Sequence, residues 1–299
     1  MIPTNCLNCS PGEVSPSACS KFVKHGFYNR SSDGKRIQRY RCTGCGKSPS
    51  VATFDNCFRQ KKRHMNERVV ELLCSGVSLR RAALLTKLNR KTVVRIFLIE
   101  SMRAEFAYRT ANLNGAKADT VEFDDMETFE HTKCKPLSIT LAVEQGSRRI
   151  LGVEVSAMAA NGKLAKKARR IYGKRKDERR AARRRLFARI VSSVKPGAKI
   201  KSDQNPHYPK DVAKAFPGCT HERHKGKRGS LGGQGEIKKV KFDPLFSLNH
   251  TCAMFRANIN RLFRKTWCTT KKAERLYAHI MLYVEFHNSK LIAPPRPVI

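Results

Sequence analysis

The chain has 299 residues, enough for about two domains of ordinary size, and 40% of them are hydrophobic, which excludes a disordered tail. The 61 Lys and Arg residues outnumber the 24 Asp and Glu residues, giving a formal net charge of +37. This balance is typical of proteins that bind a polyanion. Nucleic acid is the first candidate and an anionic membrane surface the second, but no apolar run is long enough to span a bilayer.

The first residues, Met1 to Cys6, lack the basic-then-apolar layout of a signal peptide. We therefore expect the protein to stay in a reducing compartment. In such a compartment the eleven cysteines are expected to be thiols or metal ligands rather than disulfides.

Two C-x-x-C pairs, Cys6 with Cys9 and Cys42 with Cys45, indicate a structural zinc site in residues 1–58. Two thiolates at this spacing fit on one tight turn and present both sulfurs to a tetrahedral Zn²⁺. A module of this size with few large apolar side chains needs such a cross-link in order to fold. The sequence therefore predicts a small zinc-binding hairpin.

The second pair lies in a turn that contains Gly44 and Gly46, which supply the backbone freedom that a zinc-binding turn requires. Cys19 leaves one alternative open, because it could replace a member of the first pair. We expect the other cysteines to have no part in the site.

Residues 60–112 predict three helices. Val69, Leu72 and Leu73 form one apolar face of the first helix, and Gly76 is expected to end it. Ser78 is expected to cap the second helix.

Asn89 is expected to cap the third helix, whose Val93, Val94 and Phe97 face inward. This leaves four polar or basic side chains exposed near its N-terminal end: Arg90, Lys91, Thr92 and Arg95. A recognition helix presents side chains to DNA at this end, so the pattern favours a DNA-binding helix-turn-helix. The alternative is an ordinary three-helix scaffold with a solvated basic face.

Three β-type runs follow, Val121–Phe123, Leu137–Val143 and Ile150–Val155, and they predict an antiparallel meander. After a basic run come a short strand from Ala198 to Ser202 and a helical region from about Pro244 to His287. This order of strands and helices is typical of an RNase H-like α/β fold.

The basic run from Lys163 to Arg189 alternates charged clusters with apolar residues. Its spacing predicts a helix with a thin apolar stripe and a wide basic face that follows a DNA backbone, with Arg183, Arg184 and Arg185 among the contacts. The alternative is a solvated charged helix. Further along, Trp267 is expected to pack in the core rather than to stack on bases.

Five motifs resemble one family. They are Gln38 to Lys47, containing Cys42-Thr43-Gly44-Cys45-Gly46-Lys47; Gly76 to Ala83, with the pattern Gly-x-Ser-x-Arg-x-x-Ala; Val121 to Met126; Ile200 to Asp203; and a C-terminal helix with Leu248-Asn249, Phe255-Arg256, Asn260-Arg261-Leu262 and Arg264 to Cys268. With these motifs most of the chain resembles bacterial insertion-sequence transposases of the DDE type, and it is most similar to the group that includes insertion sequence one.

The resemblance implies an α/β protein with three parts. A zinc-ribbon DNA-binding module would span 1–58 and a helix-turn-helix 60–112. An RNase H-like catalytic domain with a mixed five-stranded sheet would span 117–290, with a basic insertion at 160–190. It also implies a DNA transposase that binds terminal inverted repeats and target DNA as a homo-oligomer. We expect this enzyme in the bacterial cytoplasm, associated with the nucleoid and not with a membrane.

The family's reaction is strand cleavage and transfer with two Mg²⁺ ions, which Mn²⁺ can replace and which prefer oxygen ligands. The resemblance assigns Asp124 and Asp203 as ligands. Strand alternation alone leaves Asp124 and Asp125 open, and the resemblance favours Asp124. Asn249 stands where the family normally has Glu, and Arg256 takes the place of a Lys or Arg two helical turns later. Some insertion-sequence groups have a similar Asp-Asp-Asn arrangement, and the alternative is a degenerate site.

Two other functions remain open. A catalytically inactive regulator would use the same zinc ribbon and helix-turn-helix to bind DNA. An RNA-binding protein of the translation machinery would explain the charge but not the helix-turn-helix. The first alternative differs from a transposase in whether Asp124, Asp203 and Asn249 converge.

Overall fold

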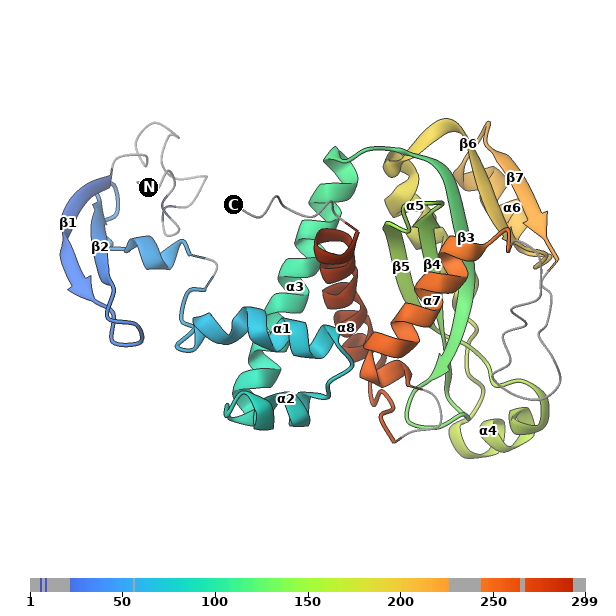
Figure 1. Cartoon of the computed structure of the whole chain (residues 1–299), viewed down its shortest axis with the longest axis horizontal. Helices are drawn as coiled ribbons and strands as arrows, with labels where there is room; N and C mark the ends of the chain where they lie inside the picture. Colours follow the sequence, from blue (N-terminus) through green and yellow to red (C-terminus); the bar gives the residue numbers. More distant parts are fainter. Residues whose placement is uncertain are drawn as a thin grey trace. The chain divides into compact units, whose positions relative to one another are not determined.

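The structure is a computed structural model that describes Cys6, Cys9 and residues 22–55, 57–225, 243–263 and 267–292. The chain divides into two compact units, Met1–Asn66 and Glu67–Ile299 (Figure 1). Cys19, which could have replaced a zinc ligand, lies outside the described residues.

The first unit contains an antiparallel hairpin of β1 (Phe22–Asn29) and β2 (Arg36–Cys42). Two short 3-10 helices follow, Val51–Thr53 and Arg63–Met65. The buried apolar residues described in this unit are few: Tyr40, Cys42 and Ala52. So small a core agrees with the expectation that this unit needs a cross-link.

Three helices open the second unit: α1 (Asn66–Cys74), α2 (Leu79–Leu85) and α3 (Arg90–Asn114). Gly76 follows α1 with φ +78°, so the predicted stop is confirmed. The Ser78 side chain accepts a hydrogen bond from the Arg81 amide at 3.2 Å, and Asn89 accepts one from the Lys91 amide at 2.8 Å. Both predicted helix caps are therefore confirmed.

The rest of the second unit is built around one mixed sheet. Its strands are β3 (Ala118–Phe129), β4 (Pro136–Glu144), β5 (Ile150–Ala157), β6 (Val194–Asp203) and β7 (Thr220–His224). They lie in the order β5-β4-β3-β6-β7. β4 is antiparallel to β3 and to β5, whereas β6 is parallel to β3 and to β7. The predicted meander, the α/β class and the five-stranded mixed sheet are confirmed.

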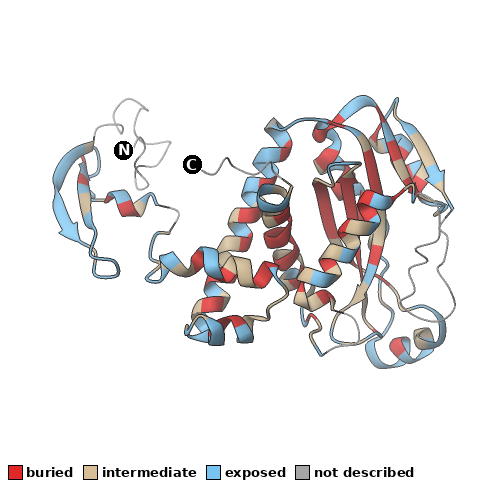
Figure 2. Cartoon of the chain, in the orientation of Figure 1, coloured by how far each residue is buried: buried red, intermediate tan, exposed pale blue. Residues whose placement is uncertain are grey.

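Helices cover the sheet on both faces (Figure 1). On one face, α7 (Phe246–Asn258) and α8 (Ala273–Phe286) share a core with β4, β5 and the three N-terminal helices of the unit. On the other face, α5 (Arg179–Ile190) and α6 (Tyr208–Ala215) pack against β3, β6 and β5. Figure 2 shows β4 and β5 almost entirely buried between these layers.

Two helix predictions and one packing prediction are wrong. The basic run forms two helices, α4 (Ala165–Tyr172) and α5, because Gly173 interrupts it with φ +74°. The C-terminal helical region is also divided, into α7 and α8. Trp267, expected in the core, is fully exposed.

None of the helices in the described ranges is long and apolar enough to cross a membrane. The longest, α3, has 25 residues, and charged residues such as Arg95 and Arg103 interrupt its apolar positions.

Candidate functional site

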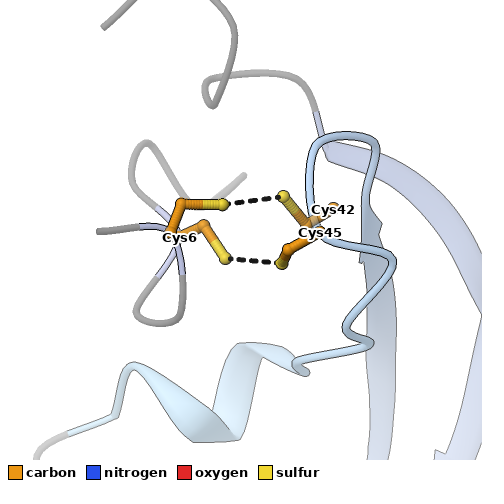
Figure 3. A group of neighbouring side chains, drawn as sticks. Cys6, Cys42 and Cys45 are labelled. Atoms are coloured by element: carbon orange, nitrogen blue, oxygen red, sulfur yellow. Dashed lines mark hydrogen bonds between the residues drawn. The ribbon is translucent and has the colours of Figure 1, made fainter. Parts of the chain in front are cut away.

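The four cysteines of the two C-x-x-C pairs come together in the first unit (Figure 3). Their sulfur atoms lie within 4.8 Å of one another. The Sγ atoms of Cys6 and Cys45 are 3.5 Å apart, and those of Cys9 and Cys42 are 3.8 Å apart. Tetrahedral zinc with Zn–S bonds of about 2.3 Å places its sulfurs about 3.8 Å apart. The cluster can therefore hold a metal ion such as zinc.

The backbone around Cys42 favours a thiolate ligand. The amides of Cys45 and Gly44 donate to its sulfur and lower the pKa of the thiol against the opposing effect of burial. Gly46 has φ +70°, as the predicted turn requires, whereas Gly44 does not adopt a positive φ. Cys9 is disulfide-bonded in the structure, which differs from the expectation that the cysteines are thiols or metal ligands, so its sulfur becomes a metal ligand only after reduction.

Asp124 and Asp203 lie on the same face of the sheet, on neighbouring parallel strands. Glu122 of β3 pairs with Lys201 of β6, and two residues further along each strand the register leads to Asp124 and Asp203. Parallel strands in register point paired residues to one face. The Asp203 carboxylate is close enough to raise the pKa of Asp124.

The structure separates Asp124 from Asp125, which sequence alternation could not do. Asp124 pairs with Leu141 of β4, on the face covered by α7 and α8. Asp125 points to the opposite face, where it pairs with Arg183 at 3.1 Å and accepts a hydrogen bond from Thr140. Asp124 is thus the member of the pair that shares a face with Asp203.

The Asp124 carboxylate is held on one side only. Its Oδ1 accepts hydrogen bonds from the Asp125 amide at 2.7 Å and from the Tyr208 hydroxyl at 3.0 Å. Burial raises the pKa of Asp124 to about 6, opposed by the Asp125 amide and reinforced by Asp203. Within the described part of the chain, Oδ2 has no hydrogen-bond or ionic partner.

Asp203 is similarly arranged. Its Oδ1 accepts the Asn205 amide at 2.9 Å, and Oδ2 has no partner among the described residues. Two carboxylate oxygens on one face, neither bound to a cationic side chain, match the donors that Mg²⁺ prefers. The residues therefore fit a divalent cation.

A buried acid fixes the start of α7 over this face. Glu122 is 1% exposed, and its Oε2 accepts a hydrogen bond from the Leu248 amide at 2.8 Å. One turn after Leu248, Cys252 is close enough to Asp124 for that carboxylate to raise its pKa, although burial is the main cause and Arg256 opposes it. The helix therefore runs along β3 from Glu122 towards Asp124.

Asn249 occupies the exposed edge of α7, three residues before Cys252 and seven before Arg256, on the same stripe of the helix. No hydrogen bond joins it to Asp124 or Asp203 among the described residues. Its Nδ2 donates to Asp243 Oδ2 at 2.8 Å. Because a carboxylate only accepts, this contact fixes the amide orientation and leaves the Asn249 carbonyl oxygen without a partner in the described ranges.

The side chains predicted to contact DNA divide into exposed and buried groups. Arg90, Lys91 and Arg95 are exposed at the start of α3, and Thr92 is half-buried. On α5, the side chains of Arg184 and Arg185 are each 53% exposed.

Arg183 is 3% exposed and forms ion pairs with Asp211 and Asp125, so it cannot contact a DNA backbone. The prediction for this residue is corrected, because its position on α5 faces the sheet rather than solvent.

Sequence reasoning missed the residues that surround the two aspartates. Tyr208 and Asp211 lie on α6, Asp243 precedes α7, and Cys252 lies on α7. The only signal for Cys252 was its helical spacing from Asn249. Nothing local to Tyr208 or Asp211 distinguishes them, because their partners are distant in the chain.

No protein-family model matches the chain, and the comparison with curated proteins finds no match.

Proposed function

We propose that the protein is a DNA transposase of an insertion sequence, which binds terminal inverted repeats and catalyses Mg²⁺-dependent strand cleavage and transfer. One observation carries this proposal. In a chain with 61 Lys and Arg residues, Asp124 and Asp203 share one face of neighbouring strands, and no cationic side chain among the described residues pairs with either. Acids without a cationic partner in so basic a chain are best explained by a cation that they bind.

The fold supports the same proposal. Three antiparallel strands followed by two parallel ones, with helices on both faces, agree with an RNase H-like domain. The three helices α1 to α3, of which α2 and α3 are capped by Ser78 and Asn89, agree with a helix-turn-helix whose exposed Arg90, Lys91 and Arg95 would contact DNA. The cysteine cluster would form a zinc ribbon in the same protein.

The chemistry follows from the donor set. When bound, two Mg²⁺ ions stabilise the attacking and leaving oxygens of an in-line displacement at a phosphodiester. Asp124 and Asp203 would hold the ions through their free oxygens, and Asn249 would offer its amide oxygen, which Asp243 orients. Arg256 would place positive charge beside a DNA phosphate. The proposed enzyme acts as a homo-oligomer on DNA in the bacterial cytoplasm and nucleoid.

The test is a cleavage and strand-transfer assay with the full chain, Mg²⁺ and a supercoiled plasmid that carries the DNA flanking the gene. Wild-type protein is expected to release the flanked segment and join it to target DNA. Asp124→Asn should lower cleavage below detection, because it removes a charged metal ligand, while DNA binding persists. Asn249→Ala should abolish strand transfer.

Asp119→Asn is the matched control, since Asp119 lies on the same strand with its side chain 77% exposed and paired with Lys195. It should cleave as the wild type does. Undiminished cleavage by Asp124→Asn would overturn the catalytic assignment. DNA binding without cleavage by any variant, the wild type included, would identify a regulator instead.

A further inference from the structure

A buried cation lies on the face of the sheet opposite the proposed magnesium site. The Arg183 guanidinium, on α5, contacts Asp211 Oδ2 through Nε at 3.1 Å and Nη2 at 2.8 Å. Its Nη1 donates to Asp125 Oδ2 at 3.1 Å. Asp211 is 1% exposed. One guanidinium therefore connects α6 to β3 beneath the surface.

Tyr208 links this cation to Asp124. The Arg183 Cζ atom lies 4.6 Å from the centre of the Tyr208 ring. The centres of the Tyr208 and Phe123 rings are 4.8 Å apart. The Tyr208 hydroxyl is 3.0 Å from Asp124 Oδ1 and 3.1 Å from Asp125 Oδ2. The ring is thus fixed by packing, and its hydroxyl sits between two carboxylates.

The hydroxyl has a single proton to give to these two acceptors. Both oxygens of Asp125 already have other donors, because Thr140 donates to Oδ1 and Arg183 to Oδ2. Asp124 Oδ1 receives only the Asp125 amide besides Tyr208. The hydrogen bond that Tyr208 donates therefore matters more to Asp124 than to Asp125, because the Asp124 carboxylate has fewer other donors.

We propose that Tyr208, fixed by Arg183, is a positioning residue that holds Oδ1 of Asp124 and leaves Oδ2 to bind the metal ion. This inference rests on the proposed function. Residues that orient a metal ligand without touching the ion commonly change metal affinity by tenfold or more. A buried ion pair alone is weak evidence for a stabilising role, since apolar residues can often replace it.

The test is a titration of the full, reduced, zinc-loaded chain with Mn²⁺, followed by electron paramagnetic resonance of the free ion. Tyr208→Phe removes one oxygen and keeps the ring between Arg183 and Phe123. We expect it to weaken Mn²⁺ binding about tenfold. In the cleavage assay it should raise the Mg²⁺ concentration needed for half-maximal rate more than it lowers the rate at saturating Mg²⁺.

Tyr283→Phe is the matched control, because Tyr283 is also fully buried and its hydroxyl accepts from Asn258 at 3.2 Å, away from Asp124. It should bind Mn²⁺ as the wild type does. Thr140→Val is a second probe that keeps side-chain volume. Loss of the Thr140 donor makes Asp125 compete for the Tyr208 proton, so Mn²⁺ binding should weaken here too.

The outcomes separate the two proposals. Asp124→Asn should lose Mn²⁺ binding altogether. If it does, while Tyr208→Phe and Thr140→Val bind as tightly as the Tyr283→Phe control, the positioning role is overturned and the metal site stands. If Tyr208→Phe does not fold, the Thr140→Val result decides. If Asp124→Asn binds Mn²⁺ like the wild type, the metal site itself is wrong, and the positioning role with it.

Discussion

Arg183 and Arg184 are adjacent in the chain but have different surroundings on α5. Arg183 is 3% exposed and bridges Asp211 and Asp125, whereas the side chain of Arg184 is 53% exposed and lies 3.6 Å from Asp211. Removing one partner of a buried pair leaves an uncompensated charge, which costs about 3–5 kcal/mol. We expect Arg183→Met to destabilise the protein by about that amount. Arg184→Met should change the free energy of unfolding by about 1 kcal/mol or less.

Urea unfolding followed by circular dichroism measures both values at pH 7. The two variants remove the same charge from neighbouring positions, so long-range electrostatics changes equally in both. Equal destabilisation would contradict the buried bridge. It would mean that water stabilises the Asp211 and Asp125 carboxylates as much as Arg183 does.

His279 provides a second prediction at a single residue. It is 1% exposed on α8, and its Nε2 donates to the Leu73 carbonyl oxygen at 3.0 Å. Burial lowers the pKa of His279 from 6.5 to about 4, although the bond to Leu73 opposes this shift. As pH falls below 6.5, the unfolded chain binds the proton before the folded one does. This residue's contribution to stability is therefore present above pH 6.5 and is lost as pH falls towards 4.

The loss should approach about 3 kcal/mol across this window, since each pKa unit corresponds to about 1.4 kcal/mol. His279→Gln keeps a donor for Leu73 but cannot titrate. We expect its free energy of unfolding to fall less steeply than that of the wild type between pH 6.5 and 4.5. Because the comparison cancels the other titrating groups, parallel pH profiles would show that His279 is not the responsible residue.

Among the elements, α5 depends on one glycine of β5 for its position. A Cβ atom at Gly152 would overlap Leu186 Cδ1 and would lie 2.7 Å from Ile190 Cγ2, both on α5. Both side chains are fully buried and have little room to move. Gly152→Ala should therefore destabilise the protein by about 1–3 kcal/mol, as overpacked cores do. Thermal unfolding checks this.

Gly146→Ala is the control for Gly152→Ala. Gly146 has φ +84°, but a Cβ there meets no atom within 4 Å, so its cost comes from backbone strain alone. The destabilisation by Gly152→Ala should depend on the side chains of α5, whereas that by Gly146→Ala should not. Trimming Leu186 to Ala should partly rescue Gly152→Ala and should not rescue Gly146→Ala. Absence of rescue would contradict the close approach of α5 to β5.

Element ends were predictable where the signal is local. Gly76 adopts a positive φ, and Ser78 and Asn89 accept hydrogen bonds from amides three and two residues away, so local signals specify the breaks between α1, α2 and α3. The break between α4 and α5 was also local, at Gly173, but the charge pattern across it indicated a single helix. The strands β3 to β5 were predictable from alternation and turns, although their ends extend beyond the apolar runs.

The sequence and its family resemblance pointed to Asp124 and Asp203 as candidate ligands but not to the residues that surround them. Alternation places Asp124 and Asp125 on opposite faces, but only the position of α7 tells which face carries the site. The inward turn of Arg183 depends on Asp211 and Asp125, which are 28 and 58 residues away in sequence. Contacts at such separations leave no periodic trace in the sequence.

At the scale of the whole molecule, the two units should differ in their response to metal removal. Among the residues that the structure describes, the unit Met1–Asn66 has few buried apolar side chains, whereas Glu67–Ile299 contains two large clusters. We expect the reduced chain to bind one zinc ion, and chelation to abolish amide protection in residues 22–55 only. Hydrogen exchange with mass spectrometry measures this.

Cys42→Ser should lose the zinc, and Cys57→Ser, in the same unit but outside the cluster, should retain it. Metal analysis under reducing conditions is required, because Cys9 is disulfide-bonded in the structure. Zinc retained by Cys42→Ser, or protection lost across the second unit on chelation, would contradict a structural zinc site confined to the first unit.

With a net charge of +37 the whole chain would attract DNA, so a test of the proposed contacts at the start of α3 has to separate direct contact from long-range attraction. Replacing one Lys by Gln changes the charge only to +36, a small change in the overall field. A lost phosphate contact, by contrast, lowers the slope of log Kobs against log salt concentration by about 1. We expect Lys91→Gln and Arg95→Gln each to reduce this slope for a non-specific duplex.

Lys290→Gln carries the same loss of charge, at a residue already paired with Glu67 at 3.2 Å, and should leave the slope unchanged. Fluorescence anisotropy at several salt concentrations provides the slopes. Equal slopes for all three variants would mean that the start of α3 does not touch DNA and that its basic residues act only through the overall field.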